Sequence, residues 1–245
     1  MSLEFSGNIM PKAMTLIIGI KLGQDAVIAS DGLMRFHTAR EDEEQVLKTI
    51  RLNDHLCLGF SGNTNYMVPI LKAMGIPADM TDHSMLCQAW EDSGTSLRMG
   101  YYRAQKIIES QLHNVLLNAP GDTDVSEIPA VILIGKRYGE PIMCNWGYGT
   151  DWNAFEIGTG VGVYIGKIPP ESTQERRQFE DLVEGDRSIG NAESRLIEAI
   201  RYAADWNGSK KINRNVATRR FSESFELHWD LDEPISNLPE PDLST

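Results

Sequence analysis

The chain is poor in cysteine, and its three cysteines cannot all pair with one another within one chain. They are Cys57, Cys87 and Cys144, and none stands at a spacing typical of a metal site. Secreted domains of small size usually depend on many disulfides, so this chain is expected in a reducing compartment, the cytoplasm. The five histidines are scattered as well, and the sequence therefore predicts neither a metal nor another cofactor.

Long apolar runs and an excess of basic residues are also missing. No stretch reaches the roughly 20 apolar residues of a membrane helix, and residues 1–13 contain no apolar signal-peptide core. Lysine and arginine total 23 against 35 aspartates and glutamates, which gives a net charge of −12. Because nucleic acids and anionic membranes repel so acidic a protein, neither is expected to be its main partner.

The residues that are present predict one folded domain. Apolar residues make up 41% of the chain and charged residues 24%, a balance typical of a packed core. A length of 245 residues also favours a single domain. We divide the chain into a leader, propeptide or tag over residues 1–14, a domain over residues 15–229, and an acidic, proline-rich tail over residues 230–245 that is expected to be mobile.

Apolar periodicity predicts strands, then helices, strands, a helix and strands again. Thr15–Lys21 and Ala26–Ser30 form a hairpin pattern around a polar turn, and Val46–Leu52 and His55–Phe60 form a second. Residues 158–162 are rich in glycine and are expected to form a flexible turn. This order suits two central antiparallel sheets with helices outside them. The remaining predicted helices are Ser61–Met74, a less clear one through Met85–Trp90 that Gly94 interrupts, Tyr101–Leu117 and Ser194–Trp206. The remaining strands are Ala130–Ile134, Ile142–Trp146, Asn153–Ile157, Asn213–Arg219 and Glu226–Trp229.

Thr15 opens the first predicted strand, and three residues that could activate its hydroxyl follow in order. Asp31 ends the second strand, Lys48 lies near the start of the third, and Gly62 stands at a strand-to-helix turn. A threonine hydroxyl needs a base, and the α-amine of an N-terminal threonine, with a pKa of about 7.7–8.0, can serve as one. A nearby lysine lowers the pKa of its neighbours, a carboxylate holds the lysine, and a glycine N–H can stabilise an oxyanion.

These segments resemble the start of a mature proteasome β-subunit. The resemblance is closer still to the bacterial ATP-dependent proteasome homologue, which also has Asp-Gly at the end of the second strand. It extends over most of residues 15–219. The matching segments are Thr15-Leu-Ile-Ile-Gly-Ile20, Ala26-Val-Ile-Ala-Ser-Asp-Gly32, Lys48-Thr-Ile-Arg-Leu52, Gly59-Phe-Ser-Gly-Asn-Thr64, Ile157-Gly-Thr-Gly160, which is similar to a glycine-serine-glycine turn of the family, and the helix ending Asp205-Trp-Asn207.

The resemblance implies the four-layer αββα fold of the N-terminal nucleophile hydrolases, an α+β fold, and a threonine peptidase that needs no cofactor. It assigns a role to each matching residue. The roles are Thr15 as nucleophile with its own α-amine as base, Asp31 and Lys48 as the pair that tunes it, the Gly62 N–H as oxyanion donor, and Thr159 and Asn207 as the residues that orient the amine.

The resemblance also implies how substrate and partners are bound. The family binds its substrate as an added β-strand, so the side-chain pockets beside the site select the cleaved bond. Met34, Ile50 and Phe60 are our candidates for the first pocket, and their apolar character predicts cleavage after apolar residues. The implied substrate is unfolded protein or peptide, the implied assembly a homo-oligomeric ring, and the candidate partner an ATPase unfoldase.

Met14 stands where the processed subunits of the family have glycine. This favours removal of a starting methionine over self-cleavage as the route to a free Thr15. Two alternative functions follow. If Thr15 remains blocked, the chain is a catalytically silent scaffold of the same fold, and if it is free the same chemistry could instead hydrolyse a small amide.

Overall fold

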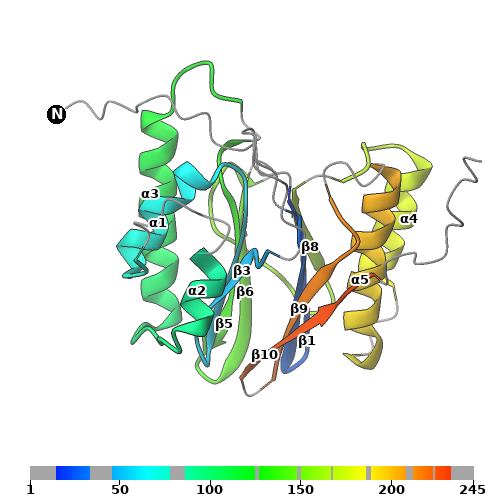
Figure 1. The fold of residues 1–245 in the computed structure, drawn as a ribbon, viewed down its shortest axis with the longest axis horizontal. Coiled ribbons are helices and arrows are strands. Elements are labelled where there is room, and N and C mark those ends of the chain that lie inside the picture. Colours follow the sequence, from blue (N-terminus) through cyan, green and yellow to red (C-terminus); the bar gives the residue numbers. More distant parts are fainter. Residues whose placement is uncertain are drawn as a thin grey trace, which may run out of the picture.

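Two antiparallel sheets stack face to face and carry helices on their outer faces (Figure 1). The first sheet has the strand order β10-β9-β2-β1-β8 and the second the order β3-β4-β5-β6-β7. This is the predicted α+β, four-layer αββα fold, which is confirmed. The computed structural model describes residues 15–33, 46–77, 86–124, 127–147, 150–166, 168–185, 189–207, 212–222 and 224–232.

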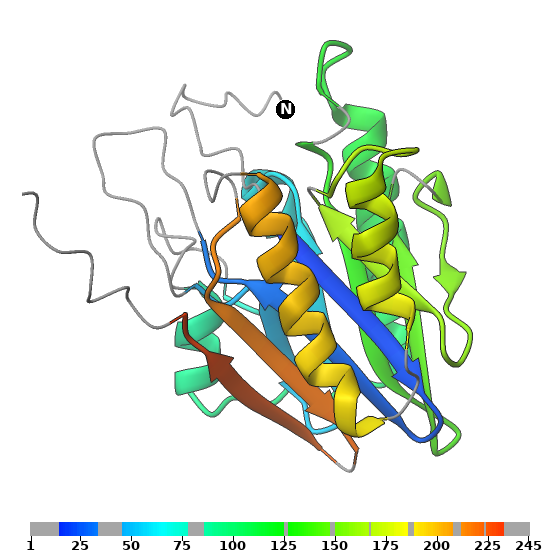
Figure 2. The same cartoon turned by 90° about the vertical axis from the view of Figure 1, so that its right-hand side faces the viewer.

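The helices divide between the two outer faces (Figures 1 and 2). The second sheet is covered by α1 (Thr64–Met74), α2 (Leu86–Asp92) and α3 (Tyr101–Asn118), and the first by α4 (Gln174–Glu184) and α5 (Ile189–Trp206). The strands of the first sheet are β1 (Leu16–Leu22), β2 (Asp25–Asp31), β8 (Gly162–Gly166), β9 (Val216–Phe221) and β10 (Phe225–Asp230). Those of the second are β3 (Thr49–Asn53), β4 (Leu56–Ser61), β5 (Ala130–Arg137), β6 (Glu140–Trp146) and β7 (Phe155–Glu156).

Apolar side chains fill all three spaces between the four layers. One cluster packs the second sheet against α1, α2 and α3, another packs the first sheet against α4 and α5, and the third lies between the sheets. β1 contributes to two of them, since Leu16, Ile18 and Ile20 contact the helix layer while Ile17 faces the other sheet. Burial on both faces explains why this strand reads as a continuous apolar run.

Two elements were not predicted from the sequence, β8 and α4. β8 lies beside β1, with Gly166 opposite Leu16 and Gly162 opposite Ile20. Its five residues begin and end with glycine, which made the segment resemble a turn. α4 buries only Phe179 and Val183, too few apolar positions for a clear helical period.

The folded part also extends further toward the C-terminus than predicted. Asp230 ends β10, and the Asp232 N–H donates a hydrogen bond to Asn215 Oδ1 at 3.0 Å. Residues 1–14 and 233–245, the remainder of the predicted leader and tail, lie outside the described residues. Among the helices described, none has both the length and the apolar composition that spanning a membrane requires.

Candidate active site

A buried ion pair joins Asp31, at the end of β2, to Lys48, just before β3. Lys48 Nζ donates to both carboxylate oxygens of Asp31, at 2.9 and 2.8 Å. The same carboxylate accepts the N–H of Leu16 at 2.8 Å and that of Leu33 at 3.2 Å. The Asp31 side chain is 0% exposed and that of Lys48 4%. Asp31 therefore fixes both the ammonium group and the backbone immediately after Thr15.

Burial drives both charged groups toward their neutral forms. It raises the pKa of the Asp31 carboxyl, against the opposing effects of the Lys48 charge and of the hydrogen bonds from Lys48, Leu16 and Leu33. Burial likewise lowers the pKa of the Lys48 ammonium, while the charge of Asp31 acts in the opposite direction. The ion pair with Asp31 favours the charged form of Lys48, and a positive charge close to Thr15 lowers the pKa of neighbouring groups, which suits a site where a hydroxyl must lose its proton.

Thr15 lies between this ion pair and the end of β8. It is 3% exposed, and on its other side Gly166 pairs with Leu16. A Cβ atom on Gly166 would lie 1.7 Å from the Thr15 carbonyl oxygen, and the glycine has a φ of +115°. Only glycine permits so close an approach in this conformation. Gly166 is thus a site residue that sequence reasoning missed, although glycines at both ends of a short apolar segment were a visible signal.

Gly62 follows β4, at the end of the second sheet that carries Lys48. The Phe60 N–H donates to the Lys48 carbonyl oxygen at 3.3 Å. Gly62 is therefore two residues along the chain from the residue that contacts Lys48. It has a φ of +107°, and a Cβ atom there would lie 3.0 Å from the Cα atom of Pro129. Asn63 then caps α1 by accepting the Asn65 N–H at 3.0 Å. The strand-to-helix turn is as predicted, and its backbone conformation requires glycine.

The two residues predicted to orient the amine lie at opposite ends of β1. Thr159 is exposed, and its neighbour Gly160 donates its N–H to the Lys21 carbonyl oxygen at 2.7 Å. At about 3.3 Å per residue, this position is roughly 20 Å from Thr15 along the strand. The prediction for Thr159 is therefore wrong, because β8 begins after this turn and brings Gly166 to Thr15 instead.

Asn207, by contrast, follows the end of α5 that lies near the site. In the last turn of that helix, Asp205 accepts two hydrogen bonds from Arg214 Nη1, both at 2.6 Å. The next residue, Asn215, accepts the N–H of Gly32 at 2.9 Å through its carbonyl oxygen. The Asn207 Nδ2 atom is buried and has no hydrogen-bond partner within the described part of the chain. It therefore makes no hydrogen bond to Thr15, and the role predicted for Asn207 stays a prediction.

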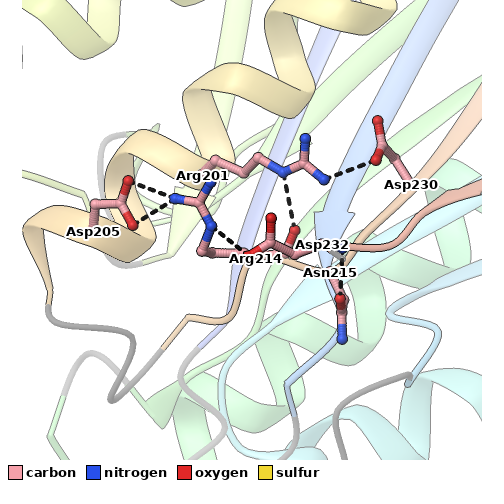
Figure 3. A network of polar contacts seen from close by, with 6 residues as sticks. All are labelled: Arg201, Asp205, Arg214, Asn215, Asp230 and Asp232. Atoms are coloured by element: carbon pink, nitrogen blue, oxygen red, sulfur yellow. Dashed lines mark hydrogen bonds and ion pairs between the residues drawn. The ribbon is translucent and has the colours of Figure 1, made fainter. Parts of the chain in front are cut away.

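A polar network fastens the segment that follows Asp31 (Figure 3). Arg214 bridges Asp205 on α5 and Asp232 beyond β10, its Nε atom lying 2.6 Å from Asp232 Oδ2. Arg201 on α5 binds Asp230 at 2.7 Å and donates to the Arg214 carbonyl oxygen at 3.3 Å. Residues 213–215 are held in this way beside Gly32, whose N–H also donates to Asn213 Oδ1 at 3.0 Å.

Of the two described residues that were predicted to line the first substrate pocket, Phe60 is partly exposed and Ile50 is buried. Ile50 is 0% exposed and packs in the cluster between the second sheet and its helices. Phe60 packs against the same cluster, and the pocket role of Ile50 stays a prediction. Met34 lies outside the described residues.

Two solved structures with the same fold come from one bacterial protein, while no protein-family model and no curated protein sequence matches the chain. Anbu from Hyphomicrobium sp. strain MC1 matches with a TM-score of 0.58 and 14% identity, covering 88% of this chain and 86% of that one. A Gly-1 mutant of the same Anbu matches with a TM-score of 0.59, 14% identity and the same coverage. The chain has a proteasome-like fold.

Burial makes the cysteine thiols of this proteasome-like fold unreactive. All three cysteines are free and buried, and burial raises the pKa of Cys57 and of Cys87 to about 12. Thiols with so high a pKa are poor nucleophiles. Nor do the described residues contain a group of three or more histidines, cysteines, aspartates and glutamates that could hold a metal ion.

Proposed function

We propose that this protein is an N-terminal threonine peptidase of the proteasome type. The observation that carries the proposal is the buried Asp31–Lys48 pair, whose carboxylate also holds the N–H of Leu16, the residue after Thr15. A buried ion pair contributes little net stability compared with well-packed apolar side chains. Its place beside a threonine at the start of a strand is better explained by catalysis.

The proposed reaction begins when residues 1–14 are removed and the α-amine of Thr15 becomes free. The amine, directly or through one water molecule, accepts the proton of the Thr15 hydroxyl, and Oγ1 attacks the peptide carbonyl carbon. The Gly62 N–H stabilises the oxyanion. The amine then gives its proton to the leaving nitrogen, and water hydrolyses the ester on Oγ1. The Lys48 charge lowers the pKa of these groups, and Asp31 fixes the lysine.

The substrate in this proposal is an unfolded protein or peptide that binds as an added strand, with Phe60 in contact with an apolar side chain. By analogy with proteasome-type peptidases, the proposal extends to a homo-oligomeric ring in the cytoplasm and to an ATPase unfoldase as partner. A hydrolase of small amides would use the same residues. One observation favours the silent scaffold instead: Thr15 is 3% exposed and follows Met14.

The test uses a chain that begins at Thr15, released from a fusion protein by proteolysis, and a threonine-directed covalent inhibitor. We expect a single adduct, mapped to Thr15 by peptide mass, together with hydrolysis of an unstructured peptide pool. The matched controls are the same chain with Thr15→Ala and the full chain from Met1, neither of which should react. A folded protein with free Thr15 that forms no adduct supports the scaffold. An adduct without peptide hydrolysis, but with turnover of a small amide, supports the amidase.

A further inference from the structure

Arg219 on β9 is a buried cation that the proposed reaction does not use. Its side chain is 1% exposed, and Ala217 and Phe221, two residues away on either side, are buried and apolar. The guanidinium reaches across to the second sheet, where Nε donates to Thr49 Oγ1 at 2.8 Å and Nη2 to the Thr49 carbonyl oxygen at 3.2 Å. The side chain of Arg219 therefore binds both the side chain and the backbone of Thr49, the first residue of β3.

The counter-ion of Arg219 comes from a third element, α2. Arg219 Nη2 donates to Glu91 Oε1 at 3.0 Å, and the same oxygen accepts the Arg51 N–H at 2.7 Å. The neighbouring Trp90 donates its Nε1–H to the Arg51 carbonyl oxygen at 3.0 Å. α2 is thus fastened to β3 at the point where Arg219 also binds that strand.

Stability alone does not explain this arrangement. Removing a guanidinium and a carboxylate from water is expensive, and apolar side chains of similar volume are often at least as stabilising. The planar guanidinium holds its hydrogen-bond donors in fixed directions. It can therefore bind the Thr49 hydroxyl, the Thr49 carbonyl and the Glu91 carboxylate at the same time, in one geometry. Such a group specifies where β3 lies relative to the first sheet.

The residue before Thr49 is Lys48, which pairs with Asp31. Consecutive residues therefore link the second sheet to two paired strands of the first: Lys48 to β2 and Thr49 to β9. We propose that Arg219 is a positioning residue that acts through Thr49 to hold the Lys48 ammonium on Asp31, with Glu91 coupling this placement to the docking of α2. The catalytic consequence rests on the proposed function, whereas the placement of Lys48 does not.

The test is a titration of Lys48 by NMR in the full chain labelled with ¹³C-lysine, its signal assigned with Lys48→Arg. Arg219→Lys keeps the positive charge but loses the planar set of donors. Because burial is the main cause of the lowered Lys48 pKa, loosening the site should raise the titration midpoint by about half a pH unit or more.

Glu91→Asp is the second variant. It keeps the negative charge, shortens the side chain and should shift the Lys48 titration midpoint in the same direction. Both variants also keep the charges of Arg219 and Glu91 that act on the buried thiols of Cys57 and Cys87.

Matched controls come from an ion pair of equal length at the surface. Arg137 and Glu156 are also 3.0 Å apart, but their side chains are 34% and 46% exposed. Arg137→Lys and Glu156→Asp should leave the Lys48 midpoint unchanged. An unchanged midpoint in folded Arg219→Lys overturns the proposal. If that variant does not fold, an unchanged midpoint in Glu91→Asp does so.

Inhibitor labelling of the same variants, made as chains that begin at Thr15, separates this inference from the proposed function. We expect about tenfold slower acylation of Thr15 in Arg219→Lys than in Arg137→Lys, because a small displacement of a catalytic group is enough to slow a reaction strongly. If no variant is labelled but the midpoint moves, the peptidase proposal fails and the positioning role stands. If labelling proceeds and the midpoint does not move, the positioning role fails alone.

Discussion

The charges between the sheets and those on the surface are held in different ways. Arg219 is 1% exposed and meets Glu91, which is 16% exposed. Arg214, at the surface, is 35% exposed and pairs with Asp205 and Asp232, which are 59% and 35% exposed (Figure 3). Surface ion pairs contribute about 0–1 kcal/mol, whereas loss of one partner from a buried pair costs about 3–5 kcal/mol. The interior charges therefore determine the geometry of the site, and the surface network only fastens the segment beside it.

Loss of the lysine at the site should have the largest effect on stability. Lys48→Met leaves the Asp31 carboxylate buried without its partner, so the free energy of unfolding should fall by about 3–5 kcal/mol at pH 7. Urea denaturation of the full chain measures this, with Glu156→Gln as the control, for which we expect a loss below about 1 kcal/mol. Equal losses in the two variants would contradict the contrast between interior and surface.

The same variant has a pH dependence of known sign. Burial already raises the pKa of Asp31 above its ordinary value of 3.8, and without Lys48 nothing of opposite charge opposes that shift. The folded state then binds a proton that the unfolded state has released, so stability falls as the pH rises above the unfolded pKa. We expect the deficit of Lys48→Met to be smaller at about pH 4 than at pH 7. A deficit that grows on acidification would contradict this.

A methyl group at Gly166 should have the next largest effect. Gly166→Ala places a Cβ atom against the Thr15 carbonyl at a φ of +115°, and we expect a loss of about 2–3 kcal/mol. Labelling of free Thr15 by a threonine-directed inhibitor should also be lost. Gly23→Ala is the control, since its φ is +58° and nothing lies within 4 Å of the added atom; it should cost about 1 kcal/mol and leave labelling intact.

Breaking the surface network should have a small effect that depends on salt. Arg214→Gln removes the links to Asp205 and Asp232, and we expect a loss of about 1 kcal/mol or less at low ionic strength. In 1 M NaCl, where the screening length is about 3 Å, the difference from the unaltered chain should nearly vanish. Urea denaturation of both chains at both salt concentrations measures the loss of unfolding free energy. A loss that does not depend on salt would contradict the view that these ion pairs are screened by solvent.

The thiols near Arg219 should show no reaction at all in the folded protein. Cys57 and Cys87 are buried and have pKa values raised to about 12, so iodoacetamide at about pH 8 should leave them unmodified until the chain unfolds. Intact mass before and after addition of urea measures this. Modification at the rate of a free thiol would mean that water enters the region around Arg219.

The sequence was sufficient for the features that depend on neighbours along the chain. The hairpin of β1 and β2, the turn at Gly62 and the four-layer order follow from local apolar patterns and glycine positions. The ion pair of Asp31 and Lys48 was predicted through the resemblance, and the structure brings these two residues together.

The misses concern pairing between distant segments. Gly166 reaches Thr15, and Arg219 reaches Thr49, only because strands far apart in the chain lie side by side. The glycines at the two ends of β8 mark an unusual segment, but no local pattern tells which distant strand a segment will meet. The error at Thr159 has the same origin, since an isolated Gly-Thr-Gly match gives no information on which end of β1 it will meet.

The most direct test of the central claim is the mass of the N-terminal peptide of the protein purified from its native cells. Our account predicts a mature chain that begins at Thr15, with the nucleophile and its amine both free. A chain that retains Met14 or any earlier residue would contradict the account, because the amine that must act as base would then be part of a peptide bond.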